Sequence, residues 1–150
     1  MKSTDPMYLL DLNALISLAD PDAIHHSAMH RWFDGGGGKD WGVCPLTEAG
    51  FIRVTTNPQY RGPQRTVAQA AAILAEFSRS AGYHYWPIPG TWSELTAPFA
   101  SRILGHQQVT DAYLLGIAIR QKGILVTFDR AITYMAGTEF HRHLMVLQGN

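Results

Sequence analysis

The sequence contains a single cysteine, Cys44, among its 150 residues. One thiol cannot form an intramolecular disulfide or build a thiolate zinc site alone, so the sequence is typical of a reducing compartment. No run approaches the roughly 20 consecutive apolar residues of a membrane-spanning helix, and the opening residues lack the apolar segment and cleavage site of a secretory signal. We therefore expect a cytoplasmic protein with no membrane contact.

The sequence also lacks net charge, because 12 Lys and Arg residues balance 12 Asp and Glu residues. Neutrality is not typical of a protein that binds nucleic acid through a uniformly basic surface. Four of the 12 acidic residues could gather around a divalent metal ion. The rest of the surface would then carry 12 basic residues against the 8 remaining acidic ones. Overall neutrality therefore does not exclude a polyanionic partner.

The alternation of apolar runs with helical patterns predicts the fold class. Strand-like runs cover residues 7–10, 41–45, 83–87, 124–128 and 144–148. Helical patterns cover residues 14–18, 25–33, 46–58, 65–82, 96–105 and 110–123, and a further short helix follows Asp129. Strands that alternate with helices at this spacing favour a three-layer α/β/α fold around a central, mostly parallel sheet. The length of the chain favours one domain over residues 1–150.

Four acidic residues stand at the junctions between these predicted elements: Asp11, Glu48, Asp111 and Asp129. Because the carboxyl ends of parallel strands meet at one edge of a sheet, we expect the four acids to converge there. Asn13 and Thr127 lie close to them in the sequence and would add further oxygen atoms. A cluster of oxygen ligands suits Mg²⁺ or Mn²⁺ better than zinc. The pattern therefore predicts a site for a hard divalent cation.

Each acid also has a purely structural interpretation. Aspartate is a favoured helix N-cap, and Asp11, Asp111 and Asp129 all stand at the start of predicted helices. Glu48 would lie in the first turn of a helix capped by Thr47, where a negative charge is favourable to the helix dipole. Capping and metal binding both stay open for each residue taken singly. Acids at four equivalent junctions favour a shared site.

Two other motifs point to different chemistry but are incomplete. His26 and His30 have the spacing of zinc ligands on a helix, but the glutamate of the zinc-protease pattern and a cysteine cluster are missing. The four glycines at 35–38 precede a lysine, but the strand, the helix and the hydroxyl residue of a phosphate-binding loop are not in the required order. We expect a flexible loop at the glycines and no zinc chemistry.

Four segments of the sequence together resemble the signature blocks of a known family. They are LLDLNALISL (9–18), LTEAGFIRV (46–54), VTDAYLLGIA (109–118) and LVTFDRA (125–131). In this order they resemble the PIN domain, in particular the VapC-type ribonuclease toxins of bacterial toxin–antitoxin pairs. The resemblance implies a PIN-like α/β/α fold and a magnesium- or manganese-dependent endoribonuclease that hydrolyses RNA phosphodiester bonds. It also implies a cognate antitoxin protein and, commonly, a toxin homodimer.

By block, the resemblance carries the acidic residues of the family onto Asp11, Glu48, Asp111 and Asp129, with Asn13 and Thr127 as supporting residues. Our hypothesis is that Asp11 and Asp111 hold the principal ion directly. Glu48 and Asp129 would then act directly or through water, oriented by Asn13 and Thr127.

Two points stay open. Arg53 and Arg61 are candidates for contacts to the RNA backbone, but ordinary solvated arginines explain them equally well. A catalytically inert PIN-like module that binds RNA or a protein is the alternative to an enzyme, and retention of all four acids favours the enzyme.

A phospho-acceptor receiver domain is disfavoured, because the run at 83–87 supplies no acceptor aspartate and the run at 144–148 is followed by no lysine.

Overall fold

The structure is a computed structural model that describes residues 7–149. Its strands are β1 (Tyr8–Leu10), β2 (Trp41–Gly42), β3 (Ile124–Thr127) and β4 (Leu144–Val146). Its α-helices are α1 (Leu12–Ala19), α2 (His26–Asp34), α3 (Pro45–Thr55), α4 (Val67–Ser78), α5 (Trp92–Thr96), α6 (Val109–Arg120) and α7 (Ile132–Phe140). Short 3₁₀ segments lie at Gly37–Lys39, Ala97–Arg102, His106–Gln108 and His141–His143.

The strands form one parallel sheet in the order β2-β1-β3-β4. Tyr8 of β1 pairs with Trp41 of β2 on one side and with Ile124 of β3 on the other. The chain therefore leaves β1 toward one edge of the sheet and later crosses back to its other side, so the strand order reverses beside β1. In open α/β sheets, ligands bind at such a reversal, beyond the carboxyl ends of the strands.

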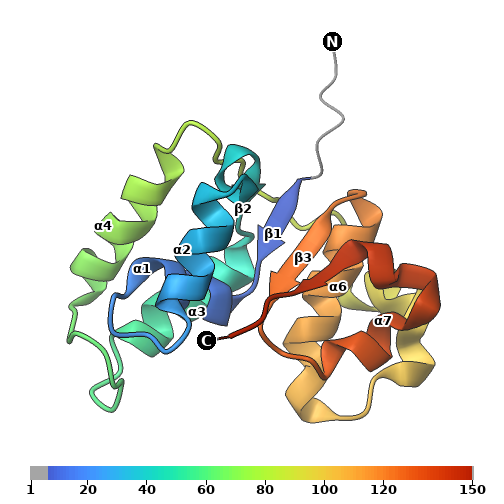
Figure 1. The fold of residues 1–150 in the computed structure, drawn as a ribbon. Helices are drawn as coiled ribbons and strands as arrows, with labels where there is room; N and C mark the ends of the chain where they lie inside the picture. Colours follow the sequence, from blue (N-terminus) through green and yellow to red (C-terminus); the bar gives the residue numbers. More distant parts are fainter. Residues whose placement is uncertain (1–6, 150) are drawn as a thin grey trace.

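Helices cover both faces of this sheet. Successive side chains of a strand point to opposite faces, so neighbouring strand residues pack in different hydrophobic clusters. Leu9 and Leu125 pack in a hydrophobic cluster with residues of α5, α6 and α7. Leu10 and Val126, one position further along each strand, pack in a second cluster with residues of α1, α2, α3 and α4. Figure 1 shows α1–α4 on one side of the sheet and α6 and α7 on the other. The structure confirms the predicted three-layer α/β/α class with a parallel sheet.

The strand predicted at 83–87 is not formed, and this prediction is wrong. Tyr83 makes an isolated parallel bridge to Trp41, and the backbone N–H of Trp86 donates a hydrogen bond to the carbonyl of Val43. The segment thus follows the edge of β2 without becoming a strand. Its partner β2 spans only two residues, and Pro45 and Pro87 lack the N–H groups that a longer ladder would need.

The start of α3 also differs from the prediction. The helix begins at Pro45, with Cys44 as its N-cap, so Thr47 lies within the first turn and is not the cap. Proline is well suited to the first position of a helix, because its fixed φ matches the helix and the missing N–H is not needed there.

The glycine run predicted as a flexible loop contains the 3₁₀ turn Gly37–Lys39. A Cβ atom at Gly37 would lie 2.3 Å from the Trp32 ring, and one at Gly38 would lie 2.7 Å from the Phe33 ring. The glycines therefore let the backbone pack directly on the aromatic side chains of α2, and this packing orders the turn.

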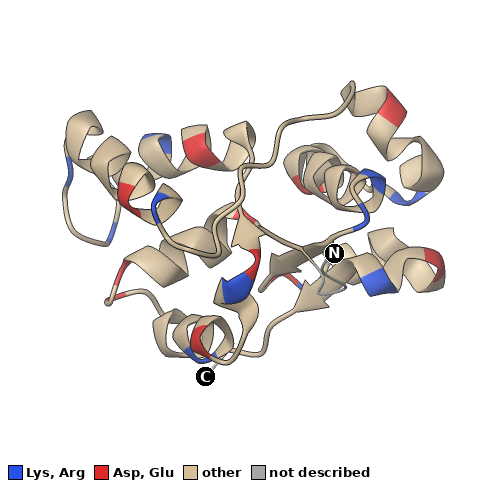
Figure 2. Ribbon diagram, turned by 90° about the horizontal axis from the view of Figure 1, so that it is seen from above, with Lys and Arg blue, Asp and Glu red and all other residues tan. Residues whose placement is uncertain are grey.

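Among residues 7–149, no helix is both long and apolar enough to cross a membrane. Figure 2 shows acidic and basic residues spread over both halves of the molecule, with no helix layer dominated by one sign. Any electrostatic preference must therefore come from local groupings of charge, and the edge of the sheet beside β1 holds such a grouping.

Candidate active site

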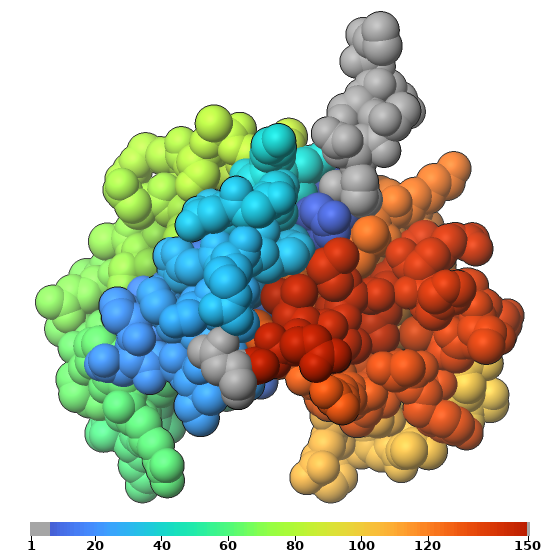
Figure 3. Space-filling model, in the orientation of Figure 1, coloured from blue at the N-terminus to red at the C-terminus, as the bar shows by residue number. Residues whose placement is uncertain are grey.

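A pocket of about 530 Å³ opens at the carboxyl ends of the strands, beside the reversal of strand order. Residues from the start of α1, from α3 and from the start of α6 line it: Asp11, Leu12, Asn13, Pro45, Leu46, Thr47, Ala49, Gly50, Arg53, Thr110, Asp111 and Leu114. Figure 3 shows the molecule hollowed between its blue and green half and its orange half, where these segments meet. The pocket lies where the topology of the sheet favours a ligand.

Asp11 is the buried acid of this pocket, with 5% of its surface exposed. It directly follows β1 and is the N-cap of α1, since its Oδ1 accepts a hydrogen bond of 2.8 Å from the N–H of Ala14. The pKa of Asp11 is raised from 3.8 to about 6: burial raises it most, the hydrogen bonds from Thr127 and Ala14 lower it, and the charges of Asp111 and Asp129 raise it. The capping interpretation is therefore correct for Asp11, but the cap alone does not compensate the burial of its charge.

Thr127, the last residue of β3, connects two of the acids. Its hydroxyl donates a hydrogen bond of 2.5 Å to Oδ2 of Asp11 and accepts one of 3.0 Å from the N–H of Asp129. Asp129 is exposed, and its Oδ1 accepts a hydrogen bond of 2.9 Å from the N–H of Ala131. The two oxygens of Asp11 are thus held by groups from two elements, and Asp129 is fixed just beyond the end of β3.

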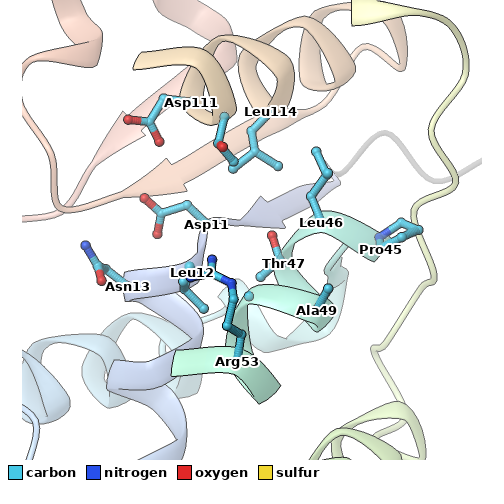
Figure 4. A pocket seen from close by; sticks show the side chains of 12 residues that line it. Asp11, Leu12, Asn13, Pro45, Leu46, Thr47, Ala49, Arg53, Asp111 and Leu114 are labelled. Carbon is cyan, nitrogen blue, oxygen red and sulfur yellow. The ribbon is translucent and has the colours of Figure 1, made fainter. Parts of the chain in front are cut away.

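Asp111 reaches the same pocket from α6. It lies in the first turn of that helix, is partly buried, and makes no hydrogen bond or ion pair within residues 7–149. Burial raises its pKa, and the charge of Asp129 raises it further. Gln108 is the N-cap residue of α6, so the capping interpretation does not apply to Asp111. Figure 4 shows the carboxylates of Asp11 and Asp111 directed to the same side of the pocket.

Asn13 and Arg53 complete the polar lining. Asn13 is exposed in the first turn of α1, and its amide lies on the same side of the pocket as the Asp11 carboxylate (Figure 4). The Arg53 side chain extends from α3 toward Asp11 and Asn13 (Figure 4). Thr47, which the sequence presents as a helix cap, instead lines the pocket and donates a 3.4 Å hydrogen bond to the carbonyl of Leu10.

Glu48 is not brought together with the other acids. It does not line the pocket, and its negative charge acts on Tyr83, where it adds to burial in raising the pKa of that phenol to about 12. On α3, Glu48 shares a face with Phe51, which is buried in the core, and with Ile52, which is partly buried against it. Because α3 begins at Pro45, the pocket receives Thr47 and Arg53 from this helix. Glu48 thus does not line the pocket beside Asp11 and Asp111, and its part in the site stays a prediction.

Arg61 lies outside the pocket, in the segment between α3 and α4. It lines a neighbouring groove together with Arg53, so the two arginines predicted to contact RNA do lie in one region of the surface. Both are exposed.

The donor set of this pocket suits an open Mg²⁺ site more than a metal site in which all ligands come from the protein. Within the described part of the chain, no group of three or more His, Cys, Asp or Glu side chains is close enough to hold a metal ion. Mg²⁺, however, is commonly bound by one or two carboxylates, with water and substrate phosphate as its other ligands. Asp11 and Asp111 supply that pair in an open pocket, and each has a pKa raised by burial and by neighbouring negative charge. A divalent cation would relieve both effects.

The fold and the pocket thus define a parallel α/β protein with a carboxylate site at the reversal of its strand order. The sequence profile of the PIN domain matches residues 8–137, and the chain belongs to the PIN-domain family.

Related proteins are similar over most of their length. The chain is 38% identical over 124 residues to the protein of Mycobacterium tuberculosis H37Rv named Ribonuclease VapC39, in an alignment that covers 83% of this chain and 89% of that protein. It is 38% identical over 130 residues to Ribonuclease VapC38 of the same strain, with 87% and 90% covered.

Solved structures share the fold at low sequence identity. VapBC2 from Rickettsia felis, bound to a promoter DNA fragment, aligns with a TM-score of 0.62 at 12% identity and covers 95% of this chain and 99% of that chain. A toxin–antitoxin complex from Klebsiella pneumoniae aligns with a TM-score of 0.61 at 15% identity, covering 93% and 96%. At these identities the comparison concerns the fold alone.

Proposed function

We propose that this protein is an endoribonuclease that acts as the toxin of a toxin–antitoxin pair. One observation carries the proposal: Asp11 and Asp111, from separate elements, line one pocket at the reversal of strand order, and the pKa of each is raised. Membership of the PIN-domain family and relatives named ribonucleases support RNA as the substrate. Hydrolysis of the phosphodiester bond requires an activated water and neutralisation of charge on the phosphate.

Magnesium or manganese is the cofactor that fits this donor set, with Asp11 and Asp111 as the residues that would hold it. When bound, such an ion would lower the pKa of a water molecule and would add positive charge at the phosphate. The remaining roles belong to the chain itself. Thr127 and the N–H of Ala14 hold the two Asp11 oxygens in one orientation, as groups behind metal ligands do. Asp111 makes no such bonds within residues 7–149, so its carboxylate is available to the ligand.

Asp129 and Asn13 have supporting roles in this proposal. Asp129 adds negative charge to the site, since it raises the pKa of both other aspartates. Asn13 lines the pocket and is exposed, so its amide can orient water or a phosphate oxygen. A catalytic role for Glu48 stays part of the proposal only through water or through a change in the position of its side chain.

The partners follow from the same proposal. Solved relatives whose titles name toxin–antitoxin complexes support a cognate antitoxin protein for this chain. We further propose that residues 1–150 work as one nuclease domain, that the toxin forms a homodimer, and that it acts on RNA in the cytoplasm.

Cleavage of total RNA by the purified full-length protein tests the function. We expect cutting in the presence of Mg²⁺ or Mn²⁺, loss of cutting with EDTA, and recovery when the ion is restored in excess. Asp111→Asn should lower the rate at least about a hundredfold, because even groups behind a metal ligand typically contribute ten- to a hundredfold. The fold should be kept, since the Asp111 carboxylate makes no hydrogen bond within the described residues.

Asp22→Asn is the matched control, because Asp22 is exposed and lies outside the pocket. It should cut RNA at the wild-type rate. If wild-type protein binds RNA but cuts none with any divalent ion, the inert binding module replaces the enzyme. If Asp111→Asn cuts normally, the metal role of this residue is wrong.

A further inference from the structure

A second groove adjoins the catalytic pocket along α3. Its volume is about 430 Å³, and it is lined by Arg53, Val54, Asn57, Gln59, Tyr60 and Arg61. We call it the Arg53 groove, because Arg53 lines both this groove and the catalytic pocket. A chain-like ligand with its reacting group at Asp11 and Asp111 can therefore continue over Arg53 into the groove without crossing the rest of the surface.

The charge of the groove is opposite to that of the pocket. Two arginines and no acidic residue line it. Arg53 and Arg61 are exposed, and neither forms a hydrogen bond or an ion pair within residues 7–149. Their guanidinium groups are therefore available to an external anion. The catalytic pocket, in contrast, contains two carboxylates and needs a cation, so the two cavities together suit a phosphate chain of which one unit is held through a metal ion.

The segment that carries Arg61 has no regular secondary structure, yet it is fixed at two points. The guanidinium of Arg65 forms a salt bridge with Asp20, which is 1% exposed at the end of α1. The hydroxyl of Tyr60 donates a hydrogen bond to the same carboxylate. Tyr60 and Arg65 stand on either side of Arg61 in the sequence, so the buried Asp20 holds down the chain around it. Arg65 is neutralised by this contact, whereas Arg61 is left exposed.

We propose that a single RNA strand crosses Arg53 and lies in the Arg53 groove, where Arg53 and Arg61 each contact a backbone phosphate. This inference rests on the proposed ribonuclease function and assigns the path of its substrate. A single strand is favoured because Asp11 is only 5% exposed at the base of the pocket. A flexible strand can turn a phosphate into that recess, whereas a duplex keeps its phosphates on a stiff cylinder. Val54 and Tyr60 offer surfaces against which unstacked bases can lie.

Binding measurements under conditions without cleavage test the path. The probe is a fluorescent, unstructured RNA of about a dozen nucleotides, titrated with the full-length protein in EDTA at salt concentrations from roughly 50 to 200 mM. The slope of log affinity against log salt falls by about 0.7 for each single-strand phosphate contact that is lost. Arg53→Gln and Arg61→Gln should each lower the slope by about that amount, and the double variant by about twice as much.

Arg142→Gln is the matched control, because Arg142 is also exposed but lies in the 3₁₀ segment His141–His143, outside both cavities. It removes the same net charge and should leave the slope within error of wild type. Arg61→Glu should weaken binding more than Arg61→Gln. Thermal unfolding of each variant should match wild type, since neither arginine has a partner within residues 7–149.

The outcomes separate this inference from the function on which it rests. If the groove variants bind RNA with the wild-type affinity and slope, the path is wrong even if the protein cuts RNA; a groove that serves a protein partner instead would give this result. If the groove variants lose RNA contacts but the wild-type protein cuts nothing with any divalent ion, the path stands and the nuclease proposal fails. An equal loss in Arg142→Gln would show diffuse electrostatic attraction and would overturn the specific path.

Discussion

Helix α1 is flanked by two buried aspartates, the N-cap Asp11 and the C-cap Asp20, and their carboxylates have opposite surroundings. Asp20, at the C-terminal end, accepts hydrogen bonds from the Arg65 guanidinium and from the Tyr60 hydroxyl. Asp11, at the N-terminal end, has hydrogen bonds from Thr127 and Ala14 but no Lys, Arg or His within ion-pairing distance in the described chain. Its charge is further disfavoured by Asp111 and Asp129.

The difference separates an acid whose charge the fold compensates from one whose charge it does not. A buried charge with a cation and a second donor is compensated within the fold, and Asp20 uses that compensation to fix the segment after α3. A buried carboxylate surrounded by other carboxylates costs stability, and clusters of this kind are typical of sites that bind a cation. The surroundings of Asp11 therefore support the cation-binding role proposed above, whereas the charge of Asp20 is compensated within the protein.

The largest effect on the fold should come from Asp20→Ala. This substitution leaves the mostly buried Arg65 without its counter-charge and removes the partner of Tyr60. Breaking a buried pair on one side typically costs about 3–5 kcal/mol, so we expect a loss of unfolding free energy of that size in urea. Asp22→Ala, two residues later and exposed, should change it by less than about 0.5 kcal/mol. Equal losses in both variants would mean that the ion pair contributes little.

The opposite effect is expected at the other end of α1. The pKa of Asp11 is about 6 in the folded chain and close to 3.8 when unfolded, so the folded state binds more protons between these values. Stability of the metal-free protein should therefore fall as the pH rises from about 4 to about 6, and Asp11 should then cost about 3 kcal/mol at higher pH. Asp11→Asn keeps a cap of similar quality and cannot ionise.

Urea unfolding in EDTA at two pH values measures this effect. At pH 8, Asp11→Asn should be more stable than wild type by up to about 3 kcal/mol, and below pH 4 the two proteins should be equal. The exposed Asp22→Asn variant should show no such pH-dependent difference. If Asp11→Asn is destabilised at both pH values, the aspartate is needed for the cap and the Thr127 contact, and the contrast with Asp20 disappears.

The sequence predicts Asp11 and its surroundings better than it predicts Asp20. Asp11 directly follows an apolar strand, and Asp129 follows another, so the parallel topology alone places both at one edge of the sheet. Asp20 gives no such signal, because its partner Arg65 is 45 residues away and comes from a segment without regular structure. The layers of the fold are predictable from local periodicity, whereas a buried ion pair between distant segments is not.

The run at 83–87 and the position of Glu48 depart from the prediction for two different physical reasons. The run at 83–87 has the composition of a strand, but the short β2 and two prolines prevent a ladder. Glu48 has the right distance in sequence from β2, but its direction depends on the residue at which α3 begins. Cys44 is the N-cap and Pro45 the first helical residue, and a helix turns by about 100° per residue, so this choice decides which side chain faces the pocket. The amino-acid composition of this segment does not determine the residue at which α3 begins, and so does not determine which side chains face the pocket.

The smallest effect on activity should come from Glu48→Gln, and this variant tests the helix phase directly. Glu48 does not line the pocket, and its charge acts on Tyr83, so its replacement should lower the rate of RNA cleavage by less than about fivefold, or about 1 kcal/mol of activation free energy. Asp111→Asn, measured in the same assay, should lose at least about a hundredfold. A loss in Glu48→Gln as large as that of Asp111→Asn, with unchanged thermal unfolding, would contradict the arrangement of α3 described above. It would mean that Glu48 turns into the pocket when metal and RNA are bound, so that the fourth acid of the family pattern joins the site only in the active complex.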